Sequence, residues 1–170
     1  MQSNFEASNN PKTILAVLEE IKSAKEKNCD IIVVEYRNDP AIEDKKYRLG
    51  HQYKATHEEI LSEIEDYEKA SIVHKYECNG SFYIKEFLLM ADCNVNIDSF
   101  RVCGVNTDAC VATTVNDLAD DLFDAQFKIV KAACNCASDQ VKGKFGSMYD
   151  ADGKYNPFKA FNPAANIKIV

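Results

Sequence analysis

Residues 100–111 read FRVCGVNTDACV, an apolar run followed by a tight turn and the start of a helix. The helix is predicted because apolar residues recur at the spacing of one helical face: Val111, Val115, Leu118 and Leu122. The segment is therefore a short buried strand that turns sharply and continues as an amphipathic helix.

The same alternation of strand and helix extends over most of the chain. One helix is predicted to begin at the Asn10–Pro11 cap, where apolar residues follow at helical spacing. A second is predicted to begin at a capping box at Thr56, and a third to span Ser81 to Met90. Short strands are predicted over 31–35, 71–74, 100–103 and 127–130, and the final IKIV as an edge strand.

Unbroken apolar strands that alternate with helices indicate a parallel sheet covered on both faces. We therefore expect an α/β fold, a Rossmann-like three-layer α/β/α sandwich with a mostly parallel sheet. In such folds, sites lie at the carboxyl ends of the strands. Here these ends are residues 36–40, 75–81, 104–110 and 131–138.

Length and composition predict one domain over residues 1–170, with 36–55 as a loop and 139–170 as an irregular C-terminal extension. The net charge of −7 makes nucleic acid an unfavourable partner. No apolar run approaches the roughly 20 residues that span a bilayer, so no membrane association is expected. The polar first residues lack a secretory signal, and seven cysteines is an odd count, which favours reduced thiols in a cytoplasmic protein.

Cys110 follows the turn in the first turn of the predicted helix. Unpaired backbone N–H groups and the positive end of the helix dipole there stabilise a thiolate and can hold a developing oxyanion. The alternative is a small buried cysteine that packs under the helix.

The stretch GVNTDACVATTVNDLADDLF resembles the signature turn and helix of the isochorismatase-like cysteine hydrolases, which include nicotinamidases and N-carbamoylsarcosine amidases. Upstream, HKYECNGSF at residues 74–82 resembles the family's lysine loop, and residues 11–35 resemble its first helix and second strand. The resemblance covers roughly residues 1–138 and implies the isochorismatase-like hydrolase fold.

The resemblance implies an Asp–Lys–Cys triad, in which Cys110 is the nucleophile and Lys75 the lysine. It also implies a cis peptide between Val105 and Asn106, and an oxyanion hole formed by the Asn106 and Cys110 amides. By position alone, Lys75 is a solvated lysine after a strand. The resemblance further places Gln2, Phe5 and Thr107 at the pocket.

In the family, the aspartate ends the first strand and is followed by a short pattern that ends in phenylalanine. MQSNF at residues 1–5 resembles the end of that pattern, so the family aspartate would lie just upstream of Met1 and is not in this sequence. Either the recorded start is too late, which we expect, or the protein lacks its general base. Ala133 is a further departure, since many relatives have an acidic residue after the fourth strand.

No metal and no cofactor is expected. Nicotinamidases of the family bind a metal through histidines after the second strand, but residues 35–40 contain none, and His51, His57 and His74 have no ligand spacing. Cys134 and Cys136 lack the second pair that structural zinc needs.

The sequence therefore predicts a hydrolase that cleaves a C–N bond of a small amide or carbamoyl compound through a covalent thioester. The alternative is a catalytically inactive member that acts as a binding or scaffold module, and a weaker one is a thiol redox protein. The predicted partner is a small-molecule substrate, and the resemblance implies a homo-oligomer.

Overall fold

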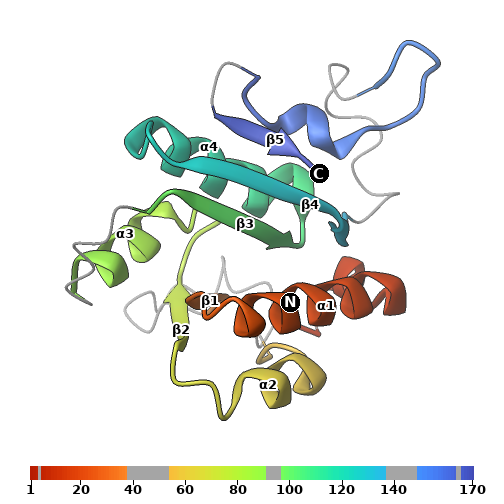
Figure 1. Cartoon of the computed structure of the whole chain (residues 1–170). Helices are drawn as coiled ribbons and strands as arrows, with labels where there is room; N and C mark the ends of the chain where they lie inside the picture. Colours follow the sequence, from red (N-terminus) through yellow and green to blue (C-terminus); the bar gives the residue numbers. More distant parts are fainter. Residues whose placement is uncertain (4, 38–53, 91–96, 137–148, 164–165) are drawn as a thin grey trace, which may run out of the picture.

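The computed structural model describes residues 1–3, 5–37, 54–90, 97–136, 149–163 and 166–170 (Figure 1). Most of the predicted loop over 36–55 lies outside these residues, as do His51 and the first part of the predicted C-terminal extension.

Helices and strands alternate along the described chain. The helical elements are η1 (Glu6–Asn9), α1 (Pro11–Glu26), α2 (Glu58–Ile64), α3 (Ser81–Met90), the π-helical turn η2 (Thr107–Val111), α4 (Ala112–Asp121) and η4 (Pro157–Ala160). The strands are β1 (Ile31–Tyr36), β2 (Ala70–Lys75), β3 (Ser99–Gly104), β4 (Gln126–Cys134) and β5 (Ile167–Ile169).

All the strand pairs in the described chain are parallel, in two groups: β1 with β2, and β3, β4 and β5 in that order. The α/β class and the parallel pairing predicted from the sequence are confirmed. The final strand, β5, pairs with β4 at the edge of its sheet, as the IKIV pattern predicted.

Helices cover the sheets on both sides, so the molecule has three layers. Buried residues of α3 and α4 form one core cluster with Phe127 and Ile129 of β4. Buried residues of α1 and α2 form a second cluster with Val130 and Ala133 of the same strand. In Figure 1, β3 and β4 accordingly lie between α4 and α1.

Local sequence signals explain α1 well. The Asn10 side chain accepts hydrogen bonds from the Lys12 and Thr13 N–H groups and so caps the helix, as predicted. Ile14, Val17 and Ile21 then turn inward and are buried.

The predicted helix from Ser81 to Met90 is confirmed, but the predicted start at Thr56 is wrong in detail. The helix α2 begins at Glu58, not at Thr56, because the Thr56 N–H is taken by the buried Glu35 carboxylate of β1 at 2.7 Å. The helix ends at Ile64, so Tyr67, which also fits the apolar spacing of the predicted helix, lies beyond it. The Ser81 hydroxyl donates to Asp117 of α4 at 2.5 Å and so ties α3 to α4.

Candidate active site

The turn after β3 is held in place by the end of β4. The Val105–Asn106 peptide bond is cis. Thr107 follows it and is fully buried, and its N–H and hydroxyl both donate to the Asn135 carbonyl, at 3.0 and 2.8 Å. The Asn135 N–H in turn donates to the Gly104 carbonyl at 3.2 Å. These bonds fix the backbone that leads into η2.

Cys110 lies in η2 and is partly buried. Its sulfur accepts a hydrogen bond from the Cys78 thiol, with 3.5 Å between the two sulfurs. The pKa of Cys110 is lowered to about 6, and this hydrogen bond is the largest cause. Partial burial opposes the shift, whereas the Lys75 charge and the backbone N–H groups of Asn106 and Cys110 add to it. Cys110 is therefore largely a thiolate at neutral pH.

Lys75 ends β2 and is buried, so it is not the solvated lysine that its position alone suggests. Its ammonium donates to the Cys78 carbonyl at 2.5 Å and lies 5.9 Å from the centre of the Tyr36 ring. Gly80 leaves room for the lysine stem, since a Cβ there would lie 3.2 Å from the Lys75 Cδ. Lys75 and Cys110 thus both contact Cys78, one through its carbonyl and the other through its thiol, and the Lys75 charge acts on the Cys110 sulfur.

The other perturbed cysteines shift in the opposite direction. Burial raises the pKa of Cys103 to about 12, and that of Cys134 and Cys136 to about 11. The hydrogen bond to Cys110, together with burial, also raises the pKa of Cys78, which keeps its proton. Among these thiols, Cys110 alone has a lowered pKa.

The sequence pointed to Cys110 and Lys75 but missed Cys78. Cys78 lies within the lysine loop, and its 32-residue separation from Cys110 hides the contact between them from any local pattern. The signal that could have found it is its place: Cys78 follows one strand end, Cys110 follows another, and parallel strand ends share an edge.

The remaining predicted pocket residues have structural roles in the described chain. Gln2 is buried, and its side chain bonds the Tyr36 N–H at 2.6 Å and the Tyr36 and Lys54 carbonyls at 2.8 and 2.6 Å. Phe5 is partly buried just before η1, where its carbonyl accepts from the Ser8 N–H at 2.9 Å. Thr107, as described above, anchors the turn.

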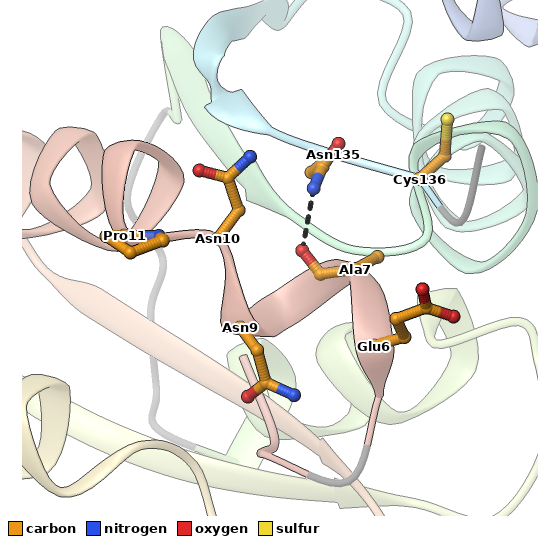
Figure 2. Close-up of a pocket in the computed structure, with 7 residues that line it drawn as sticks. All are labelled: Glu6, Ala7, Asn9, Asn10, Pro11, Asn135 and Cys136. Carbon is orange, nitrogen blue, oxygen red and sulfur yellow. Dashed lines mark hydrogen bonds between the residues drawn. The ribbon is translucent and has the colours of Figure 1, made fainter.

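A polar pocket of about 440 Å³ lies between the start of α1 and the end of β4 (Figure 2). Its lining residues are Glu6, Ala7, Asn9, Asn10, Pro11, Asn135 and Cys136. The Asn135 side chain donates to the Ala7 carbonyl at 2.9 Å and so joins its two walls. Cys110 and Lys75 do not line this pocket, so the candidate site is located by these two side chains and not by the cavity.

The histidines within the described residues have protein partners. His57 shares a hydrogen bond of 3.3 Å with the Ser8 hydroxyl, and His74 lies 3.6 Å from Glu35. Within the same described ranges, no group of three or more His, Cys, Asp or Glu side chains is arranged to hold a metal ion. None of the described helices is long and apolar enough to cross a bilayer.

The solved structures most informative for comparison share this fold. A nicotinamidase/pyrazinamidase from Bacillus subtilis superposes with a TM-score of 0.62 at 14% identity, covering 78% of this chain and 81% of that one. An N-carbamoylsarcosine amidase from Thermoplasma acidophilum gives 0.58 at 18% identity, with 76% and 73% covered. A putative hydrolase of the isochorismatase family from Chromobacterium violaceum gives 0.60 at 13% identity, with 95% and 78% covered.

No curated protein sequence is significantly similar to the chain. The model of the isochorismatase domain, however, matches residues 1–149, which include the cis peptide, the Cys110 turn and Lys75. Fold and sequence agree, and the chain belongs to the isochorismatase family.

Proposed function

We propose that the chain is a cysteine hydrolase that cleaves a C–N bond of a small amide or carbamoyl compound through a thioester on Cys110. The proposal rests on the environment of Cys110, whose sulfur accepts a hydrogen bond from Cys78 at 3.5 Å and whose pKa is lowered to about 6. Two of the structural neighbours are named as a nicotinamidase and an N-carbamoylsarcosine amidase, which cleave bonds of this kind.

In the proposed reaction, the Cys110 thiolate attacks the substrate carbonyl, and the carbonyl electrons move onto its oxygen. The backbone N–H groups of Asn106 and Cys110, which interact with the sulfur, stabilise that oxyanion in this scheme. Collapse of the adduct breaks the C–N bond, and the nitrogen leaves as ammonia or an amine after it takes up a proton. Water then hydrolyses the thioester and restores the thiol.

Lys75 has an electrostatic part in this scheme. Its buried ammonium lies beside the Cys78 segment and lowers the pKa of Cys110, so the thiolate forms before substrate binds. Within the described residues, the hydrogen bonds of Cys110 and Lys75 go to Cys78 and to backbone, not to a carboxylate. The contacts that we describe therefore activate the sulfur without the aspartate that the resemblance implies.

The lack of a carboxylate contact to Cys110 or Lys75 within the described residues favours the second candidate, a binding or scaffold module. Hydrolysis of a thioester needs a base that activates water. Among the described residues, no carboxylate contacts Cys110 or Lys75 to act as that base. In that case Cys110 binds or is acylated but does not turn over.

Ammonia release from a panel of small primary amides and carbamoyl compounds tests the proposal. Turnover that Cys110→Ala abolishes and Cys136→Ser preserves would support the hydrolase. A thioester that accumulates on Cys110 without turnover would support the second candidate, as would saturable binding with no acylation.

Homo-oligomerisation and a cytoplasmic location belong to the same proposal. The helix α3 exposes large apolar side chains, with Leu89 and Met90 81% and 86% exposed, which suits a contact between copies. Light scattering on the full chain and on Leu89→Glu tests the first of these proposals.

The described cysteines are unpaired, as thiols are in a reducing compartment, and this supports the cytoplasmic location.

A further inference from the structure

Cys78 forms a second thiol site next to the candidate nucleophile. Its sulfur lies 3.5 Å from that of Cys110, and its side chain is exposed. The proposed hydrolase reaction assigns Cys78 no bond to make or break. An accessible thiol beside a thiolate is, however, the arrangement of an oxidation-sensitive cysteine with its resolving partner.

We propose that Cys110 and Cys78 form a reversible peroxide-sensitive pair, in which Cys110 is oxidised and Cys78 closes a disulfide with it. The oxidant is hydrogen peroxide or another small hydroperoxide. The proposal shares the Cys110 sulfur with the proposed function but needs no amide turnover.

Two steps complete the oxidation. The Cys110 thiolate attacks one peroxide oxygen, the O–O bond breaks, and Cys110 becomes a sulfenic acid while hydroxide leaves and takes up a proton to form water. The Cys78 sulfur then attacks the sulfenic sulfur, an S–S bond forms, and the S–O bond breaks to release a second water. The two thiols are oxidised by two electrons, and the peroxide is reduced by two.

The described geometry permits the second step. A disulfide requires a sulfur separation near 2.05 Å, so the two sulfurs must approach by about 1.5 Å. Cys110 is held in η2, whereas Cys78 lies in a bend between β2 and α3, outside helix and strand. We therefore expect Cys78 to move toward Cys110. The Cys78 carbonyl accepts a hydrogen bond from the Lys75 ammonium.

Such a disulfide would block the nucleophile and also protect it. A lone sulfenic acid is oxidised onward to sulfinic acid, which cellular dithiols do not reduce, whereas a disulfide is reopened by thiol exchange. The pair would thus act as a reversible off-switch on the candidate site.

Mass spectrometry of the full chain tests the proposal without any substrate. After brief treatment with a few equivalents of hydrogen peroxide, the wild type should lose two hydrogen atoms and yield a peptide linked through Cys78 and Cys110, which dithiothreitol separates. Cys29→Ser, which removes an exposed thiol before β1, should behave in the same way.

Cys78→Ser is the informative variant, because its hydroxyl can still donate to the Cys110 sulfur but cannot form a disulfide. It should accumulate oxygen on Cys110 instead, as sulfinic or sulfonic acid. The proposal is wrong if the wild type and Cys78→Ser give the same oxygenated Cys110, or if Cys110 links to a different cysteine. Because the readout is a covalent link, its result is independent of whether any amide is hydrolysed.

Discussion

The hydrogen bond from Cys78 to the Cys110 sulfur gives the most direct quantitative prediction. It is the largest of the causes that together lower the pKa of Cys110 to about 6, so removal of the donor should raise that pKa. The perturbation is Cys78→Ala, which removes the thiol from an exposed side chain and leaves the buried core intact.

The size of the change follows from the strength of the lost bond. A hydrogen bond to a charged group contributes about 1.5–3 kcal/mol, and a thiol is a weak donor, so about 1.4 kcal/mol, or one pKa unit, is expected. With a pKa near 7 in place of 6, the thiolate fraction at pH 6 falls from about one half to about one tenth. Alkylation of Cys110 at pH 6 should therefore slow about fivefold, and at pH 9 hardly at all.

The assay is alkylation by iodoacetamide between pH 5 and 9, followed by peptide mapping. In the wild type, Cys110 should react with a midpoint near pH 6. Cys136, with a pKa of about 11, should react about 50-fold more slowly at pH 7. That ratio combines about 10⁴ in thiolate fraction with the lower nucleophilicity of the less basic thiolate. Cys78→Ser keeps a donor and serves as the matched control.

The reasoning would be refuted by a wild-type midpoint near the ordinary thiol value of about 8.5. It would also fail if Cys136 reacted as fast as Cys110 at pH 7. A midpoint that Cys78→Ala leaves unchanged would show that the hydrogen bond is not the cause of the lowered pKa.

Three further predictions concern the cation, the core and a buried carboxylate. Lys75→Met should also move the alkylation midpoint of Cys110 to higher pH, because the lysine charge stabilises the thiolate, whereas Lys85→Met, whose amine pairs with Asp121, should not. Phe127→Ala should lower the unfolding free energy in urea by about 3–5 kcal/mol, because Phe127 is fully buried against Phe100, whereas Phe123→Ala, at a side chain 74% exposed, should cost under about 0.5 kcal/mol. Burial has the largest influence on Glu35 and opposes its ionisation, but the Thr56 N–H and Arg37 outweigh it and hold the pKa of Glu35 below its usual value. The stability that these contacts supply is complete above pH about 4.3 and declines below it, so the difference in unfolding free energy between wild type and Glu35→Gln should narrow as the pH falls below that value.

The local sequence pattern predicted the positions of helices and strands correctly, except where a residue distant in the sequence binds a backbone group that the pattern assigns to a cap. The Asn10 cap and the inward face of α1 were predicted correctly, because both depend on neighbours within one or two turns. The Thr56 cap was not, because Glu35, 21 residues away, binds the backbone N–H that would have closed the capping box.

The site shows the same division. Cys110 could be singled out from its place after a strand and a turn, and Lys75 from the resemblance of its loop to a family motif. The burial of Lys75 and the direction of each thiol's pKa shift could not, since both depend on what packs around the side chain after folding.

The sequence by itself determined the alternation of strand and helix, the parallel class of the sheet and the turn that carries Cys110, because periodicity and turn chemistry are local. Only the tertiary structure decided that Cys78 lies 3.5 Å from Cys110 and that Lys75 is buried beside it. The physical reason is that Cys78 follows β2 and Cys110 follows β3, which belong to different groups of strands, so their meeting depends on tertiary contacts such as the Ser81–Asp117 hydrogen bond between α3 and α4. No local pattern reports which side chains of two separate loops will meet there.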